Sequence, residues 1–398
     1  MSSTLEQDCR DTLGGLKAAM IDLYASVGAD PSRPQDTSRR LRLNKTLTWN
    51  LARLMQAPSG IEAIPHLPGT ASIEKLLEAT ERKGASRQVI ERVRAAARRC
   101  EEMIETHAGD RATLDLIIDG LAGRNGRALE VSRKHAFLGN SGIYGAQART
   151  RLMSCLLAPN AAEPDQLDMV MLSGYAGLRR LRPQVRLPIF RIRQWSGEGQ
   201  QVGSAGGWEP LEPGSAGGLL GDFTSAEAPE IEAVRADGGV DYILQPGQVG
   251  NRGAIDVYQA EALRAGASRW RIGSDTTGEF GLTLMVPAET LIIDLVAHED
   301  VAYALHTRTI VRAHTFTQQG LGEESTILPI NQPAVELPGS PPAVATPLVP
   351  RYVEMEQRMF ERMGWDAADF RAVRLDMKYP PLGATIVLQF DLPESPRR

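Results

Sequence analysis

The residues with the best composition for metal chemistry lie in the second half of the chain. His298 and Glu299 are adjacent, and His306 and His314 follow at intervals of eight residues. Histidine and carboxylate together are ligands of zinc and of iron(II). The spacing matches no known metal signature, however, and isolated histidines are more often ordinary surface or core residues. We therefore predict no metal site and no cofactor. If the protein does bind a metal ion, these four residues are the candidate ligands.

Motifs for covalent or phosphate chemistry are missing. Ser141 and Ser173 lack the flanking glycines of a nucleophile elbow, and no Walker or dinucleotide-binding pattern precedes a helix. The pentapeptide GSAGG occurs at 203–207 and at 214–218, but neither copy is followed by lysine and a helix start. The region 199–221 is predicted to be a flexible surface loop. The sequence thus favours a non-enzyme, with a metal-dependent enzyme carrying a helical domain as one alternative.

A stretch near the N-terminus combines periodic leucines with basic and amide side chains. Residues 37–54 read TSRRLRLNKTLTWNLARL, and Leu41 and Leu43 bracket a break between two helical patterns. Residues 33–53 carry six basic side chains against one acid, Asp36, which gives a net charge of +5. Such a surface suits contact with phosphates.

This stretch resembles the helix-turn-helix of bacterial transcription regulators, and the resemblance covers these residues only. It rests on the small Ser38 in the first helix, on Leu41 and Leu43 at the turn, and on Leu47, Leu51 and Leu54 in the second helix. It implies that the second helix enters the major groove of double-stranded DNA, with a homodimer reading two half-sites. The candidate DNA-binding residues are Arg39, Arg40, Arg42, Asn44, Lys45, Thr46, Thr48, Asn50 and Arg53.

Two residues depart from that pattern. Arg42 stands where such turns prefer glycine, and a left-handed arginine costs roughly 1 kcal/mol, so we expect a wider turn than usual. Trp49 falls on the outer face, where an indole is better placed if it turns into the core. The alternative is a basic helical hairpin that serves packing or protein contact, as in a structural or scaffolding protein.

A second basic stretch runs from Arg179 to Arg193 without an acid and ends at Trp195. It contains Arg179, Arg180, Arg182, Arg186, Arg191 and Arg193. Its alternation partly fits a strand with one solvated face, which we favour over an extended nucleic-acid or anion-binding surface.

The elements that must position these residues change in type near Pro159. Apolar spacing of three and four predicts helices at 13–27 and 73–84, at 86–104 behind Ser86, at 110–121 behind Asp110, and at 146–157. After residue 160, short runs rich in Val, Ile and Leu predict strands at 185–192, 241–244, 282–286 and 291–297. The six prolines of 331–350 predict an extended, exposed linker. A helix at 352–363 and a strand pair at 370–378 and 385–390 complete the chain.

These elements predict an α+β multidomain protein. Residues 1–157 form a helical domain with the helix-turn-helix, 158–330 a β-rich domain of unknown role, 331–350 the linker and 351–398 a tail. Residues 1–157 hold 23 basic and 18 acidic residues, whereas 158–398 hold 21 and 31. We expect the two parts to meet different partners.

The chain is expected to be cytoplasmic. Its start lacks a signal-peptide pattern, no apolar run approaches the length of a membrane span, and Cys9, Cys100 and Cys155 form no disulfide framework. Together these features predict a DNA-binding transcription regulator with a C-terminal sensing or oligomerisation domain and no membrane partner.

Overall fold

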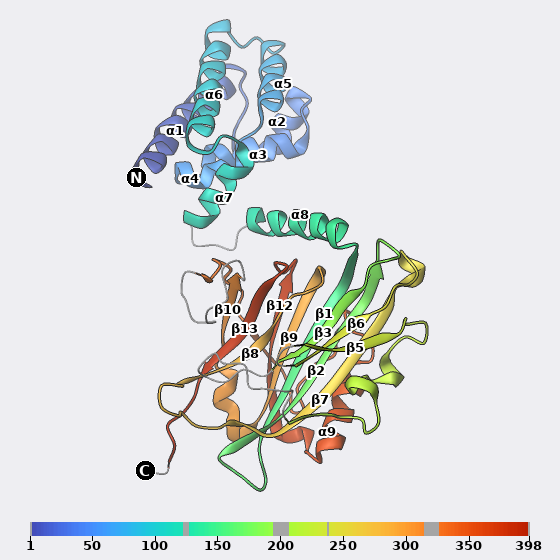
Figure 1. Cartoon of the computed structure of the whole chain (residues 1–398). Helices are drawn as coiled ribbons and strands as arrows, with labels where there is room; N and C mark the ends of the chain where they lie inside the picture. Colours follow the sequence, from blue (N-terminus) through green and yellow to red (C-terminus); the bar gives the residue numbers. More distant parts are fainter. Residues whose placement is uncertain (1, 122–126, 194–206, 237–238, 314–325, 397–398) are drawn as a thin grey trace. The chain divides into compact units, whose positions relative to one another are not determined.

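The computed structural model divides the chain into two compact units, Met1–Leu129 and Glu130–Arg398. It describes residues 2–121, 127–193, 207–236, 239–313 and 326–396. The first unit is helical and the second is rich in strands, so the protein is α+β as expected (Figure 1). The first unit ends at Leu129 and not at residue 157, and it therefore holds 19 basic and 17 acidic residues, a net charge of +2. The charge contrast between the two parts is weaker than the sequence boundary indicated.

The first unit is built around two long helices. Its α-helices are α1 (Ser2–Ser26), α2 (Pro34–Leu41), α3 (Lys45–Gln56), α4 (Gly60–Ala63), α5 (Thr70–Glu81), α6 (Arg87–Ala108) and α7 (Arg111–Leu121). Buried leucines of α1 face α6, and Cys9 on α1 lies 3.8 Å from the sulfur of Met103 on α6. Ser86 caps α6 and the Asp110 carboxylate accepts the Thr113 N–H at 2.8 Å, which confirms both predicted helix starts.

The helix predicted at 146–157 is wrong. Helix α8 (Arg127–Tyr144) ends before it, and these residues form β1 (Ala146–Pro159), which is buried on both faces. A strand that is covered on both sides reads as a continuous apolar run, and periodicity alone does not separate such a run from a buried helix.

The described residues of the second unit form one large and two small sheets. The strands are β1 (Ala146–Pro159), β2 (Gln166–Arg180), β3 (Leu187–Arg193), β4 (Trp208–Pro210), β5 (Ile231–Ala236), β6 (Gly239–Leu244), β7 (Ile255–Ser268), β8 (Thr277–Thr283), β9 (Ala288–His298), β10 (Arg308–Ala313), β11 (Val335–Leu337), β12 (Phe370–Lys378) and β13 (Ala384–Asp391). The seven-stranded sheet has the order β11-β12-β9-β1-β2-β7-β4, and the small sheets are β10-β13-β8 and β3-β6-β5. Within the large sheet, β1 and β9 are parallel.

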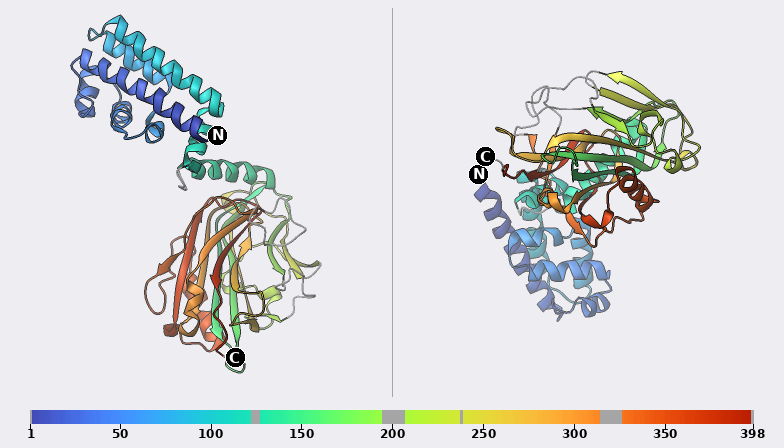
Figure 2. Two further views of the ribbon diagram at one scale, coloured as in Figure 1. Left: turned by 90° about the vertical axis from the view of Figure 1, so that its left-hand side faces the viewer. Right: turned by 90° about the horizontal axis from the view of Figure 1, so that it is seen from below.

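Helix α9 (Tyr352–Met363) covers one face of the large sheet, and β3-β6-β5 lies on the other (Figure 2). Leu152, Leu172 and Ala260 pack with Met355 of α9 in one core. Tyr175, on the opposite face of β2, has its ring centre 6.0 Å from that of Phe190 in β3. The large sheet is therefore the middle layer, which explains the apolar character of both faces of β1.

The predicted linker and strand pair are also corrected. In 331–350, β11 pairs with β12, and Val344 and Val349 are buried in the core that includes α9, so the segment is attached to the β unit and is not a free linker, although most of its residues are exposed as expected. Proline prevents regular hydrogen bonding but does not prevent apolar packing. Strands β12 and β13 are present, but they pair with different neighbours, β9 and β8 among them, and not with each other.

Other expectations concern the loops and the thiols. The first GSAGG lies outside the described residues apart from Gly207. The second packs closely, because a Cβ on Gly217 would come 2.0 Å from the Tyr242 ring, so this part is not a free surface loop. Cys9, Cys100 and Cys155 are free and buried. None of the described helices combines the length and the apolar character needed to span a bilayer.

Candidate nucleic-acid interface

The turn between α2 and α3 has three residues, Arg42 to Asn44. Arg42 adopts the left-handed conformation, with φ 55° and ψ 42°. Its N–H and the N–H of Leu43 both bond to the Ser38 carbonyl, and Leu43 packs against the core. These contacts offset a strain of about 1 kcal/mol. The turn is therefore no wider than the usual three or four residues, contrary to expectation.

The two helices are anchored by the residues that carried the sequence resemblance. Leu41, Leu51 and Leu54 are fully buried in the core of the first unit. The Ser38 hydroxyl donates to the Leu43 carbonyl at 2.7 Å, which ties the first helix to the turn. The Asn44 side chain accepts the Thr46 N–H at 2.7 Å and so caps the start of α3. The angle of α3 is thus fixed at its first turn.

The structure exposes most of the candidate DNA-binding residues but not all of them. The exposed ones are Arg39, Arg40, Arg42, Asn44, Lys45, Thr46 and Arg53. Thr48 is only 1% exposed and its hydroxyl donates to the Lys45 carbonyl, so its expected place on the outer surface is wrong. Thr48 lies one turn before Leu51 on the buried side of α3, and Asn50 is half-buried. Trp49 is 46% exposed and does not turn into the core.

Some of the exposed cations already have partners. Arg40 donates to the Gly28 carbonyl at 2.7 Å, and Arg39 lies 4.0 Å from Asp36. Within the described ranges, the side chains of Arg42, Lys45 and Arg53 make no ion pair and no hydrogen bond. An exposed ion pair contributes little, so all five cations remain accessible to a polyanion.

A histidine lies close to this surface. Burial and the positive charge of Arg53 lower the pKa of His66 below its ordinary value. His66 is therefore neutral at physiological pH and adds no charge to the interface.

The alternative catalytic candidates form no comparable site. His298 ends β9, and its ring packs edge-on to Phe370 at 5.3 Å, while His314 lies outside the described residues. Over the described part of the chain, no group of three His, Cys, Asp or Glu side chains lies close enough together to hold a metal ion. Glu299 and His306 therefore belong to no such group. The Ser141 hydroxyl donates to the Phe137 carbonyl inside α8, and Ser173 accepts from Arg151.

The second basic stretch belongs to the β unit. Arg186, just before β3, pairs with Glu232 of β5 at 2.5 Å, and Arg191 of β3 pairs with Asp241 of the neighbouring strand β6 at 3.0 Å. Arg180 is 2% exposed and donates to the carbonyls of Val185 and Leu244. These contacts fit the strand interpretation, since Arg186 and Arg191 lie beside acids of the same sheet.

A buried charged cluster beneath α9 was not predicted. Asp294, in the middle of β9, accepts two bonds from Arg374 at 2.8 and 2.6 Å and one from the Tyr352 hydroxyl at 2.8 Å. Glu356, one turn after Tyr352, is 4% exposed, and burial together with Asp294 raises its pKa to about 8. The sequence did contain a sign of this cluster, because Asp294 is an acid inside the apolar run LIIDLVA. The cluster lies under α9 and joins that helix to the sheet.

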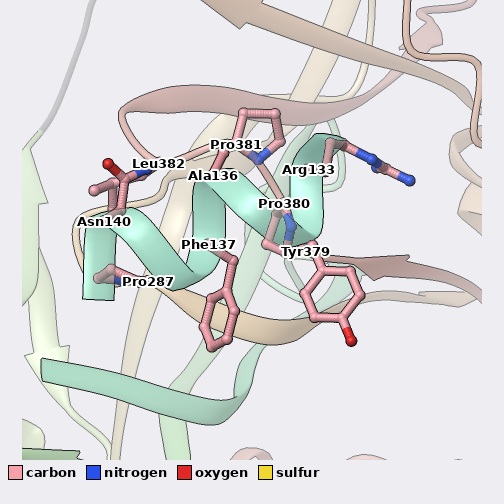
Figure 3. Close-up of a pocket in the computed structure, with 9 residues that line it drawn as sticks. All are labelled: Arg133, Ala136, Phe137, Asn140, Pro287, Tyr379, Pro380, Pro381 and Leu382. Atoms are coloured by element: carbon pink, nitrogen blue, oxygen red, sulfur yellow. The ribbon is translucent and has the colours of Figure 1, made fainter. Parts of the chain in front are cut away.

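A small hollow lies beside α8 in the β unit (Figure 3). Phe137 and Asn140 of α8 line it with the turn at 379–382, and its volume is about 50 Å³. Phe137 pairs with the ring of Tyr379 at 5.6 Å, and the Arg133 guanidinium points away from the prolines. This space suits one or two waters and is far smaller than pockets for small molecules.

Comparisons with known proteins do not place the chain in a family. No family model matches, and no curated protein is similar enough to match. Among solved structures, a candidate protease from Parabacteroides distasonis matches with 7% identity and a TM-score of 0.26, covering 62% of this chain and 40% of that one. An M1 zinc metallopeptidase from Deinococcus radiodurans matches with 7% identity and a TM-score of 0.23, covering 61% and 42%. The chain thus spans less than half of those structures, and likeness at this level supports no functional conclusion.

Proposed function

We propose that this protein is a DNA-binding transcription regulator that reads duplex DNA through α3. One observation carries the proposal: a tight three-residue turn fixes the start of α3 and leaves exposed cations, among them Arg42 and Lys45, without acidic partners in the described residues. A helix presented in this way can enter the major groove with its first residues towards the bases. The β unit then senses a ligand or supports oligomerisation.

The candidate residues divide by the contact that they can make with DNA. Arg39 and Arg40 on α2 and Arg53 in the last turn of α3 carry the charge for phosphates. Thr46 and Asn50 lie on the first turns of α3, and asparagine can make two bonds to adenine in the major groove. Contacts of the first kind give affinity for any sequence, and contacts of the second kind give choice among sequences.

The test is selection of bound sequences from a random duplex pool by the full-length protein. A recovered palindrome would support a regulator that binds two half-sites about 34 Å apart. Lys45→Ala should weaken the recovered complex, whereas Lys83→Ala, an exposed charge outside the interface, should not. Absence of duplex binding at 50 mM salt would contradict the proposal.

Trp49 favours a second candidate function, contact with a protein. An indole that is 46% exposed beside basic residues is a typical anchor at protein interfaces. If no duplex binds, α2 and α3 form a hairpin for protein contact, as in a scaffolding protein. Trp49→Ala would then abolish binding of the partner protein without altering the fold.

A further inference from the structure

Three segments of the β unit meet at the end of the large sheet where α8 leads into β1 and β2 ends (Figure 1). These segments are 140–145, 178–186 and 245–254. The Gly145 carbonyl accepts the Leu181 N–H at 2.8 Å, and the Arg180 carbonyl accepts the Gly250 N–H at 2.8 Å. Backbone hydrogen bonds thus join the three segments into one surface, which we call the turn surface.

The turn surface exposes four large apolar side chains. They are Ile143 at 71%, Tyr144 at 51%, Leu181 at 43% and Val249 at 42%. They lie on neighbouring backbone, because Leu181 is bonded to Gly145 and Val249 forms a bridge with Arg180. Apolar side chains are unfavourable in water, and a group of them is typical of a surface that binds a partner.

The turn surface is also basic, although the unit that carries it is acidic. Its three segments contain five arginines and no Asp or Glu, whereas residues 130–398 hold 25 basic and 32 acidic residues. Arg180 is buried, and Arg179 and Arg186 lie beside acids of neighbouring segments. Arg182 and Arg252 are exposed and make no ion pair with any described residue.

One of these free cations lies next to the apolar end of α8. A Cβ built on Gly145 would come 3.1 Å from Cδ of Arg182, so the stem of this arginine lies over the turn that follows Tyr144. Arginine can keep its stem on an apolar surface while its charge remains solvated. The cation and the apolar side chains can therefore meet the same partner.

This combination fits a lipid bilayer with anionic headgroups. A nucleic acid would use the arginines but would leave Ile143 and Leu181 in water. A bilayer uses both, because its phosphates attract cations, and its boundary between headgroups and acyl chains accepts aliphatic side chains and tyrosine. Side chains that project from turns need no complementary groove in a fluid partner.

We propose that the turn surface binds an anionic lipid bilayer, with Ile143, Tyr144 and Leu181 entering the headgroup region. Arg182 and Arg252 contact the lipid phosphates. The sequence alone predicted no membrane partner, because that prediction considered spanning segments and not contacts at a membrane surface. The proposal is independent of DNA binding, since none of these residues lies in α2 or α3.

The first experiment measures partition of the full-length protein onto vesicles by sedimentation. One set of vesicles contains phosphatidylcholine alone, and the other contains equal amounts of phosphatidylcholine and phosphatidylserine. The partition coefficient should be at least about tenfold higher on the anionic vesicles. Equal partition onto both sets would overturn the proposal. Absence of binding to either set would overturn it too and would leave an acidic protein as the partner of the turn surface.

Substitutions separate insertion from attraction of charge. On anionic vesicles, Ile143→Ser should lower the partition coefficient about tenfold, because less apolar surface leaves water. Arg182→Glu should lower it about fivefold or more. Ile272→Ser, at an isoleucine that is 63% exposed beyond the far end of β7, and Lys45→Ala in α3 should leave it unchanged. Full binding by Ile143→Ser, or a loss for Lys45→Ala equal to that for Arg182→Glu, would overturn the proposal.

A fluorescent label tests insertion at the same position. Because Cys9, Cys100 and Cys155 are buried, Ile143→Cys offers an exposed thiol for an environment-sensitive fluorophore. Emission should shift to shorter wavelength on anionic vesicles, and labelled Ile272→Cys, the matched control, should show no shift. Absence of a shift at position 143, or an equal shift at both positions, would overturn insertion. DNA binding by Ile143→Ser should be unchanged, so the two proposals fail separately.

Discussion

Arg42 sets the direction of α3 from a backbone conformation that side chains rarely adopt. Glycine at this position would relieve the strain, although it adds entropy to the unfolded chain. We expect Arg42→Gly to change the free energy of unfolding by no more than about 1 kcal/mol and to lower DNA affinity through loss of a cation. Arg42→Val should destabilise by roughly 1–2 kcal/mol, since β-branched residues tolerate positive φ least. Denaturant unfolding distinguishes the two, and equal stability would contradict the observed turn.

The cations around α3 should make the affinity for DNA depend strongly on salt concentration. If about four cations per subunit contact phosphates, a dimer neutralises about eight, and log affinity should fall against log salt with a slope of roughly −7. Affinity would then fall by more than about a thousandfold between 50 and 200 mM salt.

Single substitutions should separate the two kinds of contact. Arg39→Ala should weaken every sequence alike and make the slope shallower. Asn50→Ala should cost about 1–3 kcal/mol on the preferred site only. Fluorescence anisotropy with preferred and scrambled duplexes measures both effects. A uniform loss for both variants would indicate a general basic surface without sequence choice.

At the scale of elements, the helices were more predictable than the strands. Ser86 and Asp110 lie at helix starts because their side chains satisfy free N–H groups, a local requirement that the sequence displays. Strand β1 was not recognised as a strand, because both of its faces are covered and no alternation remains. Strands β2 and β7 were not predicted either, although β2 alternates between buried and half-buried positions over part of its length. Which strand pairs with which depends on contacts between distant residues, so β12 and β13 were found but their partners were not.

In the candidate interface, too, the local features could be predicted from the sequence and the others could not. The leucine positions were predicted correctly because helical period fixes them. Thr48 was misplaced by one face, because a polar residue in a short helix was taken to be outside, although its hydroxyl can bond to its own helix backbone. The left-handed Arg42 turn depends on two hydrogen bonds to Ser38, which spacing does not reveal.

Glu356 should make the stability of the β unit depend on pH. Its pKa is raised from 4.5 to about 8 by burial and by Asp294, while Arg374 acts in the opposite direction. The folded protein therefore binds this proton more tightly than the unfolded chain, and the free energy of unfolding falls as pH rises from 4.5 to about 8. Glu356→Gln retains the shape of the protonated acid and should remove this part of the dependence.

The Glu356→Gln variant should have a free energy of unfolding that is higher than that of the unchanged protein by about 2–4 kcal/mol at pH 8.5 and nearly equal to it at pH 4.5. Urea unfolding at both values measures it. Glu361→Gln, at an exposed position of the same helix, serves as the control and should give no such difference. A Glu356→Gln protein that is less stable than the unchanged protein at pH 8.5 would contradict a protonated, buried Glu356.

At the scale of the molecule, the proline-rich segment belongs to the β unit. Val344 is 1% exposed and packs beneath α9, whereas Val335 in the same segment is 65% exposed. We expect 331–350 to resist thermolysin in the native protein. Val344→Asp should lower stability by about 3 kcal/mol and open the segment to cleavage, and Val335→Asp should do neither. Early cleavage at 343–349 in the unchanged protein would contradict the observed packing.

The parallel pairing of β1 with β9 has a consequence for synthesis on the ribosome. Ala148 pairs with Ala288, 140 residues later in the chain, so the middle of the large sheet lacks one side until most of the protein has been made. The helical unit contains only its own early residues and can fold while translation continues. Contacts this distant in sequence also close slowly, because a long loop must be ordered first. The edge of β1 that pairs with β9 therefore has no partner until β9 has been made, and the first unit can fold before the second.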